Sequence, residues 1–189
     1  MESFDAVLTA AGEGSAAAFE ALWRDLQPSL ERYLRVAASS AAEDLASETW
    51  LQVARDIRGF RGDENDFRRW FFTIARHRVL DHARKQKRAR AEAVPPAAFA
   101  GIPDRHDPTG EFISTSAALE LIATLPAAQA EAITLRVVAG LSVPDVARIM
   151  GKRSGAVRVL TSRGLRTLAE RLSGTGWEAV APGRSRRGT

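Results

Sequence analysis

The feature that most restricts the fold is a stretch rich in proline and glycine, which divides the chain of 189 residues into two parts. Residues 89–113 hold four prolines and two glycines. A proline inside a helix removes a backbone hydrogen bond and clashes with the preceding turn, so this stretch has no room for a helix of useful length. We expect a flexible linker there, between an N-terminal domain at 1–88 and a C-terminal domain at 114–172. A basic, disordered tail should follow at 173–189.

Apolar residues on both sides of the linker recur at the spacing of an α-helix, and the alternation typical of strands is almost absent. The chain is 45% hydrophobic, with alanine and leucine dominant, so each part can form a core. We therefore predict an all-α fold of two small helical domains. The expected helices are Ser15–Leu26, Ser29–Val36, Ala42–Ile57, Asp66–Arg88, Ser114–Thr124, Pro126–Gly140, Ser142–Met150 and Ser154–Leu172.

Three local features of the N-terminal domain sharpen these expectations. Trp23 falls on the apolar stripe of the first helix, and Pro28 should interrupt that helix. The segment Ser40–Glu43 has the form of a capping box, in which Ser40 accepts a hydrogen bond from the first turn of the next helix. That helix should end near a polar, glycine-containing loop at 59–65.

The composition excludes several classes of site. The chain has no cysteine, so neither a disulfide nor a thiolate metal site is possible. His77 and His82 fall on different faces of one helix and His106 lies in the linker, so we expect no metal site and no other cofactor. No nucleophile, base and oxyanion donor can be assembled, so an enzyme is not expected. An acidic N-terminus and the lack of a long apolar run predict a cytoplasmic protein without membrane insertion.

Charge is distributed unevenly along the chain. Residues 1–65 carry six arginines against twelve carboxylates, whereas residues 66–90 carry nine basic residues against two aspartates. Residues 148–171 carry seven basic residues against one glutamate. Two basic segments on predicted helices favour two contacts with nucleic acid over mere solvated helix faces, and the acidic segment indicates a different partner.

The second basic segment has the pattern of a helix-turn-helix. Ser142 should cap a short helix, Gly151 supplies the left-handed residue of a tight turn, and Ser154 begins a longer basic helix. Such a second helix fits the major groove of duplex DNA. On the apolar side of this helix, Leu165 is expected to be among the packed residues. The less favoured alternative is a helical hairpin that has a purely structural role and does not bind DNA. The residues expected to face DNA are Lys152, Arg153, Ser154, Arg158, Ser162, Arg163 and Arg166.

The first basic segment combines arginines with three consecutive aromatic residues, Trp70, Phe71 and Phe72. Successive residues on a helix are rotated by about 100°, so at least one ring must be exposed or packed against another element. Basic groups along a backbone, with aromatic faces for unstacked bases, are what a single-strand surface requires. The preceding Phe60–Asn65 loop is placed to hold an extruded base, although each ring taken singly is more often part of a core.

These motifs carry a resemblance to a known family. Asp44–Val53, Phe60–Arg61 and Phe67–His82 resemble the second conserved region of extracytoplasmic-function sigma factors, the small promoter-recognition subunits of bacterial RNA polymerase. Leu125–Pro126, Gly140–Ser142 and Ser154–Arg158 resemble the fourth region of that family, in the same order. The matches cover roughly 15–88 and 114–172.

The resemblance implies a division of labour between the two domains. The helix matching Ala42–Ile57 docks on a coiled coil of the polymerase's largest subunits, and the C-terminal domain reads the minus-thirty-five element as duplex. The residues implied for core polymerase are Asp44, Glu48, Leu51, Gln52 and Arg55. Those implied for opening and holding the minus-ten element are Phe60, Arg61, Asn65, Arg69, Trp70, Arg76, Arg78, Arg84 and Lys85.

The same resemblance implies further partners. The linker would run along the polymerase, and an anti-sigma protein would hold the factor inactive until a signal arrives. The polymerase performs the chemistry, so the factor itself contributes no catalysis. The recognition helix departs from the family pattern at Val159–Ser162, where many members have a serine, an apolar residue and then histidine or a basic residue.

Two other functions are compatible with the motifs. A helix-turn-helix regulator with a sensory N-terminal domain would bind its operator tightly without polymerase, usually as a dimer. An adaptor of the anti-sigma kind would contact polymerase but not DNA. Loss of Arg158 and Arg163 would leave such an adaptor unchanged.

Overall fold

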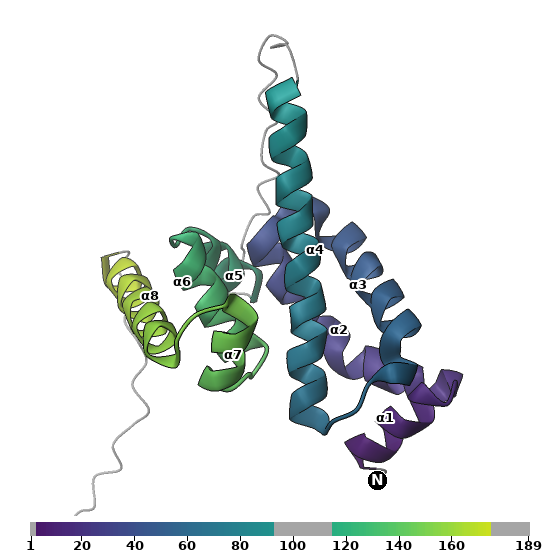
Figure 1. Cartoon of the computed structure of the whole chain (residues 1–189). Coiled ribbons are helices and arrows are strands. Elements are labelled where there is room, and N and C mark those ends of the chain that lie inside the picture. Colours follow the sequence, from purple (N-terminus) through teal and green to yellow (C-terminus); the bar gives the residue numbers. More distant parts are fainter. Residues whose placement is uncertain (1–2, 93–114, 175–189) are drawn as a thin grey trace, which may run out of the picture.

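The computed structural model describes residues 3–92 and 115–174, and every regular element in these two ranges is helical (Figure 1). The all-α prediction is therefore confirmed for the described residues. In chain order the elements are α1 (Phe4–Gly12), α2 (Ala16–Ala38), η1 (Ser39–Ala41), α3 (Ala42–Asp56), η2 (Ile57–Gly59), α4 (Glu64–Glu92), α5 (Thr115–Ala123), α6 (Ala127–Ile133), η3 (Thr134–Val138), α7 (Val143–Met150) and α8 (Ser154–Gly174).

Helix α2 is the central element of the N-terminal unit and contacts α1, α3 and α4. Leucines at every fourth position from Leu22 to Leu34 are 1% exposed or less, so they form one buried stripe. Pro28 lies inside α2 and does not interrupt it, which corrects the prediction from sequence. Pro28 is exposed, so solvent can satisfy the carbonyl that loses its donor, and the buried leucines hold both halves of the helix in line. Trp23 is also a correction, since it is 44% exposed.

Two helix starts differ from those expected. Helix α1 has no counterpart in the prediction; its N-cap is Ser3, whose side chain accepts a hydrogen bond from the Ala6 amide at 3.2 Å. Ser40 does not cap α3, because it lies in the short turn η1, and the N-cap position of α3 is Ala41, with no side-chain hydrogen bond. The helical spacing of Leu45, Thr49 and Val53 gives α3 one inner face, which is buried in the core, and Ile57 continues it into η2.

Helix α4 is longer than expected at both ends. It begins at Glu64, where the Asp63 carboxylate accepts a hydrogen bond from the Asp66 amide at 2.9 Å. It ends at Glu92, so the first four residues of the predicted linker are helical. The rest of that linker and most of the predicted tail lie outside the described residues. The second half of α4 projects beyond the other helices (Figure 1).

The C-terminal unit confirms the helix-turn-helix. The Ser142 side chain accepts a hydrogen bond from the Asp145 amide and caps α7, and Gly151 ends α7 in the left-handed conformation, at φ 62° and ψ 38°. Helix α8 then packs on α6 and α7. A Cβ added to Gly164 would lie 2.5 Å from Ile133, so glycine allows the close approach of α8 to α6. Leu165 is 46% exposed and does not pack as expected.

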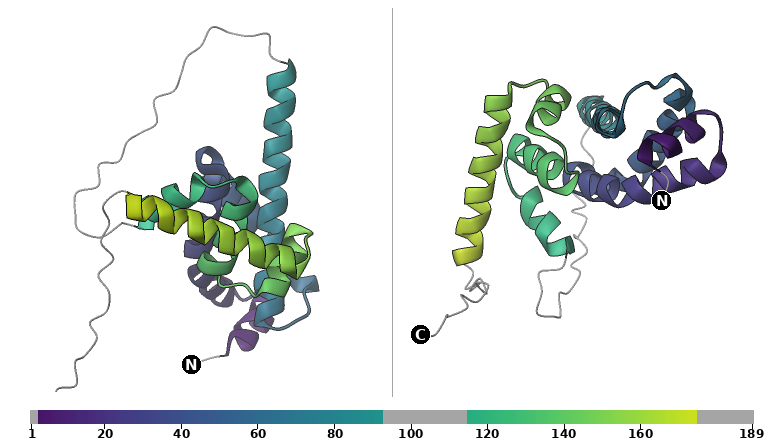
Figure 2. Two further views of the ribbon diagram at one scale, coloured as in Figure 1. Left: turned by 90° about the vertical axis from the view of Figure 1, so that its left-hand side faces the viewer. Right: turned by 90° about the horizontal axis from the view of Figure 1, so that it is seen from below.

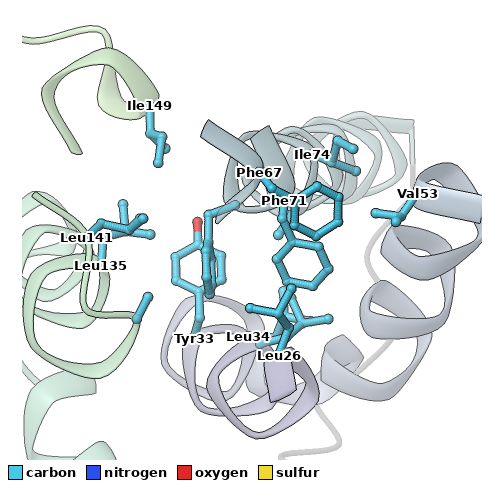
Figure 3. Close-up of a cluster of buried hydrophobic side chains, with 14 of the residues drawn as sticks. Leu26, Tyr33, Leu34, Val53, Phe67, Phe71, Ile74, Leu135, Leu141 and Ile149 are labelled. Carbon is cyan, nitrogen blue, oxygen red and sulfur yellow. The ribbon is translucent and has the colours of Figure 1, made fainter. Parts of the chain in front are cut away.

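The two units pack directly on each other. Helix α2 contacts α5, α6 and η3, and α4 contacts α7, so one cluster of buried apolar residues runs from Leu8 to Val157. Figure 3 shows Leu135, Leu141 and Ile149 of the C-terminal unit facing Tyr33 of α2. Helix α8 lies on the far side of α6 and α7 from the N-terminal unit (Figure 2). Its outer face is therefore open, while α7 covers part of α4.

Candidate nucleic-acid and polymerase interfaces

The outer face of α3 is a mixed stripe of charged and apolar side chains. Asp44, Glu48 and Arg55 are exposed at helical spacing, and Leu51 is 57% exposed between them. Gln52 is half-buried; its amide nitrogen donates to Asp56 and its amide oxygen accepts a 3.5 Å hydrogen bond from Arg78. Leu51 offers apolar area that a partner can bury, and charged side chains surround it.

The three consecutive aromatic residues of α4 divide between the core and the surface. Phe71 and Phe72 are fully buried: the Phe71 ring centroid lies 4.8 Å from that of Trp50, and the Phe72 ring packs edge-on against Tyr33. Trp70 is half-buried. The prediction that one ring must leave the common face is confirmed, and that ring is Trp70.

Trp70 belongs to a small aromatic cluster that lines an open cleft. Its ring centroid lies 5.2 Å from that of Phe60 and 5.5 Å from that of the buried Phe67. The cleft is open to solvent and has a volume of about 770 Å³, within the range of pockets that take small ligands. It is lined by Arg55, Asp56, Gly59, Phe60, Arg61, Asp66, Arg69, Trp70 and Thr73.

The loop before α4 is fixed by its own arginine. The Arg61 guanidinium donates to the carbonyl oxygens of Arg58 at 3.0 Å and Phe60 at 2.6 Å, which holds the Phe60 ring over the start of α4. Phe4 of α1 packs on Phe67 from the other side, with ring centroids 6.0 Å apart. The contribution of α1 was missed from sequence, because a short N-terminal helix with no long periodic pattern gives a weak signal. Asn65 is exposed in the first turn of α4.

Two of the predicted minus-ten residues are paired with the C-terminal unit. The Arg69 guanidinium lies 2.7 Å from the Asp66 carboxylate and 3.2 Å from that of Asp145 in α7. Arg76 donates from Nε to the Glu131 carboxylate of α6 at 2.6 Å. Burial acts to lower the pKa of Arg69, but hydrogen bonds to Asp145 and Asp66 raise it above its ordinary value. Arg69 therefore remains a cation.

A buried tyrosine lies beside the second of these ion pairs. Burial raises the pKa of Tyr33 well above its ordinary value; the Glu131 carboxylate adds to this shift and Arg76 opposes it. Tyr33 is thus a neutral phenol at any physiological pH. It lines a cavity of about 260 Å³ between the units, together with Arg76 and Glu131.

The remaining basic residues of α4 lie farther along the helix. Arg84 forms a 2.9 Å ion pair with Asp81, and its side chain remains 69% exposed. Lys85 is exposed, and Arg78 is half-buried, with its Nε atom buried and unpaired within the described residues. A hollow of about 300 Å³ brings Arg78, Arg84 and Lys85 next to Glu48 of α3. The proposed polymerase face and this part of α4 are therefore continuous.

The recognition helix presents its predicted residues outward. Val157 is fully buried on the inner side of α8 and Gly164 lies against α6, whereas Ser154 is half-buried at the start of the helix. Val159 is 47% exposed, on the outer side. The exposed polar and basic residues of the turn and helix are Lys152, Arg153, Arg158, Ser162, Arg163 and Arg166.

Comparison with known proteins identifies this arrangement. The family model for Sigma-70 region 2 matches residues 22–89, and that for Sigma-70, region 4 matches residues 116–168. The fold and its two faces thus define a sigma-70-type transcription factor with both regions in order. The match to region 2 covers all of α3 and most of α2 and α4, the helices that a conventional regulator would need for a sensory domain.

The similar proteins narrow the family. The chain is 38% identical to the ECF RNA polymerase sigma factor BldN of Streptomyces coelicolor, over 84% of the chain and 62% of BldN, so it spans less than two thirds of that relative. It is 30% identical to the ECF RNA polymerase sigma factor SigD of Mycobacterium tuberculosis, over 93% of the chain and 86% of SigD. The chain belongs to the extracytoplasmic-function sigma factors, and it is an RNA polymerase sigma factor that recognises promoter DNA in transcription initiation.

A solved structure has the same fold. The sigma factor RpoE from Bartonella quintana, in complex with the anti-sigma factor NepR, has a TM-score of 0.64 and 25% identity, covering 82% of this chain and 96% of that one. Within the described ranges of this protein, no helix combines the length and apolar character needed to cross a membrane. Nor does any group of three or more potential metal ligands occur in these ranges.

Proposed function

We propose that this sigma factor divides promoter recognition between the two faces described above. The N-terminal domain, 1–88, docks on core polymerase and holds the minus-ten element, and the C-terminal domain, 114–172, reads the minus-thirty-five element. The observation that carries the proposal is the open aromatic cleft of Phe60 and Trp70, which adjoins the basic face of α4. Such a cleft suits an unstacked base, whereas a regulator that binds only duplex DNA takes up no unstacked base.

Core polymerase is proposed to dock on the outer face of α3. Leu51 provides apolar area that is free to be buried, while Asp44, Glu48 and Arg55 provide charges around it. This is the usual anatomy of a protein interface, in which an apolar centre supplies affinity and a polar rim supplies specificity. Gln52 is proposed to act less by direct contact than through its bonds to Asp56 and Arg78, which join α3 to α4.

The minus-ten element is proposed to bind as a separated strand along α4. An unstacked base inserts into the cleft against Trp70 and Phe60, and stacking of one base on an aromatic ring contributes about 1–3 kcal/mol. Arg61 lines the cleft, and Asn65 is exposed in the first turn of α4. The phosphates are proposed to contact two groups of cations on different sides of α4. Arg69 and Arg76 face the C-terminal unit, and Arg78, Arg84 and Lys85 lie beside α3.

The minus-thirty-five element is proposed to bind as duplex against α8. The outer face of α8 is free in this conformation, so its insertion into a major groove requires no rearrangement of the unit. Arg158, Ser162 and Arg163 lie where base edges would be, and the remaining residues contact phosphates. These remaining residues are Lys152, Arg153, Ser154 and Arg166.

Three further features are proposed for the cellular protein. It acts in the cytoplasm, on the nucleoid, because that is where polymerase and promoters are. It contributes no catalytic group, since the polymerase forms the phosphodiester bonds. An anti-sigma protein controls it, and the support for this is the structural similarity to a sigma factor solved in complex with one.

The experiment that tests the function is transcription by core polymerase from a matched bacterium, with and without this protein, on a fragmented genomic template. Sequencing the 5′ ends of the transcripts should give a set of start sites that depends on the protein. Those sites should share two upstream elements at constant spacing. If no start site depends on the added protein, the proposal is wrong.

A further inference from the structure

The contact between the two units uses residues that the proposed function assigns to DNA. Arg69 and Arg76 lie two helical turns apart on α4, and each is bonded to a carboxylate of the C-terminal unit. The Arg76 and Glu131 side chains are 20% and 22% exposed, and the Asp145 side chain is 13% exposed. These are not loose surface ion pairs, because both partners are largely shielded from water.

Asp145 and Glu131 occupy guanidinium donors of Arg69 and Arg76 that a phosphate would need. An arginine guanidinium binds carboxylate and phosphate through the same donors, so one cannot be bound fully while the other remains. Asp145 is held in place from its own side as well, by Ser142 and by Arg148 at 3.5 Å. Helix α7 therefore presents a fixed anion to the first turns of α4.

An apolar seam stabilises the same contact. Leu135, Leu141 and Ile149 are 6% exposed or less and face Tyr33 (Figure 3). Burial of such side chains contributes free energy in proportion to area, so the seam favours association while the ion pairs set its register. The seam and the ion pairs form a single contact surface between α2 and α4 on one side and α6, η3 and α7 on the other.

We propose that Glu131 and Asp145 hold the free sigma factor in a closed conformation, in which they occupy the arginines that minus-ten DNA binds. The inference rests on the proposed role of Arg69 and Arg76. Opening of the contact exposes both arginines and frees the C-terminal unit to reach its own element. The apparent DNA affinity of the free protein is then reduced by the fraction of molecules that are closed.

The closure can be measured independently of DNA. The chain contains no cysteine, so Ala21→Cys on α2 and Ala169→Cys on α8 introduce two unique spin-label sites at exposed positions. The full-length protein should give one narrow distance distribution by double electron–electron resonance. Glu131→Arg places two cations together and should broaden and lengthen the distribution, whereas Arg76→Glu combined with Glu131→Arg should restore it.

A matched charge control comes from the same unit. Glu120 is exposed on α5, so Glu120→Arg makes the same change of charge away from the contact and should leave the distance unchanged. An unchanged distribution in Glu131→Arg would overturn the proposal, as would equal opening by Glu120→Arg. Failure of the double substitution to restore the narrow distribution would show that the ion pair does not hold the contact.

Binding of a short, fluorescent single-stranded DNA of mixed sequence tests the masking. Glu131→Gln should strengthen binding roughly threefold to tenfold over the wild type, and adding Arg76→Gln to Glu131→Gln, where the ion pair is already broken, should weaken it. If Glu131→Gln opens the protein but does not raise the affinity, the masking is refuted while the proposed function stands. If Arg76→Gln has no effect on binding in the Glu131→Gln background, the assignment of Arg76 to DNA fails instead, and the proposed masking of Arg76 fails with it.

A second inference concerns Val159 and rests on a different observation. Each helical residue is rotated by about 100°, so Val159 lies about 200° from the buried Val157, at the centre of the outer face of α8. It is 47% exposed between Arg158 and Ser162. A side chain without a donor or acceptor cannot read the hydrogen-bonding groups of a base edge. The one apolar group on the major-groove edges is the thymine methyl.

We infer that Val159 selects thymine at one position of the minus-thirty-five element, a specificity that rests on the proposed function of α8. The test uses core polymerase with the full chain on a promoter mapped as above, with each upstream thymine replaced in turn by deoxyuridine, which removes only the methyl group. At one position the wild type should lose about threefold to fivefold in promoter binding.

The variants separate this inference from the function itself. Val159→Ser should bind the thymine and deoxyuridine promoters equally, and Leu165→Ala, an exposed apolar residue off the centre of the face, should keep the wild-type difference. If the wild type binds all the substituted promoters equally, or if Val159→Ser retains the difference, the inference is wrong although start-site selection persists. If no protein-dependent start site exists, the proposed function and this inference fail together.

Discussion

The two basic faces of the molecule are built in opposite ways. In the first half of α4 three arginines are already paired with carboxylates: Arg68 with Glu64 and Asp25, Arg69 with Asp66 and Asp145, and Arg76 with Glu131. On the outer face of α8, Arg158, Arg163 and Arg166 form no salt bridge within the described residues. The α8 face can meet a polyanion as it stands, whereas part of the α4 face must first exchange its partners.

The two helices also differ in what their inner sides do. Helix α4 buries Phe67, Phe71 and Phe72 completely and so forms the core of its unit, whereas α8 buries little beyond Val157. A helix that contributes to the core and to a binding face contains some residues whose substitution should affect folding and others whose substitution should affect DNA binding. The following predictions, in order of expected effect, test where that division falls.

The largest effect is expected for Phe72→Ala. The ring is fully buried against Tyr33, so its removal should lower the free energy of unfolding by about 3–5 kcal/mol, as measured by urea titration. Leu165→Ala on α8 is the matched change of an exposed apolar residue and should cost less than about 1 kcal/mol. If both substitutions lowered the free energy of unfolding by a similar amount, α4 would contribute no more to the stability of the fold than α8 does.

Arg158→Ala combined with Arg163→Ala should have the next largest effect, on binding rather than folding. Each base-specific contact contributes about 1–3 kcal/mol, and removal of cationic contacts should also reduce the salt dependence of promoter binding by the polymerase complex. The unfolding midpoint should not change, since both side chains are exposed. Unaltered binding of a duplex minus-thirty-five element would remove α8 from the promoter interface.

Trp70→Ala should separate strand opening from strand binding. Loss of a stacking surface should cost about 1–3 kcal/mol in forming the open complex on duplex promoter. The loss should be smaller on a template that is already melted, because stacking also compensates for the unpaired base during opening. Permanganate footprinting of melted thymines on the two templates measures the difference. Equal losses on both would point to a folding role for Trp70.

The smallest effect is expected for Ser142→Ala, which removes the cap of α7. Loss of such a cap typically costs about 1 kcal/mol, detectable as a shift in thermal unfolding of the full chain. Ser40→Ala is the matched control, because Ser40 has a capping-box sequence but caps no helix here, and its change should be near zero. If the two substitutions cost the same, the assignment of caps is wrong.

Much of the local structure was predictable from sequence because the signals are local. Ser142 and Gly151 fix the ends of α7 through their own side-chain and backbone properties, and Leu45 to Ile57 mark the inner face of α3 by spacing alone. Pro28 and Ser40 gave wrong predictions because packing outweighed local preference. The leucine stripe of α2 keeps the helix continuous, and η1 turns the chain into α3 before a side-chain cap can form.

The candidate sites also contain some features that the sequence predicted and others that it did not. Exposure of Arg158 and Arg163 followed from the helical period, whereas the pairing of Arg69 with Asp145 joins residues far apart in sequence. The aromatic cluster at Trp70 also includes Phe67, on which Phe4 of α1 packs, and the sequence gives no strong pattern for α1. Contacts of this kind depend on how whole helices pack. The hydrophobic period of a sequence predicts which face of a helix is buried, but not which other helix packs against that face.

The sequence by itself determined that the chain is helical, that it has two parts, and that two of its helices are basic, since hydrophobic spacing, proline placement and charge are properties of the chain. Only the tertiary structure decided that the parts pack together and that Glu131 and Asp145 meet the arginines of α4. The physical reason is that an arginine binds a carboxylate and a phosphate alike, so its partner in the free protein depends on which anion the fold brings near.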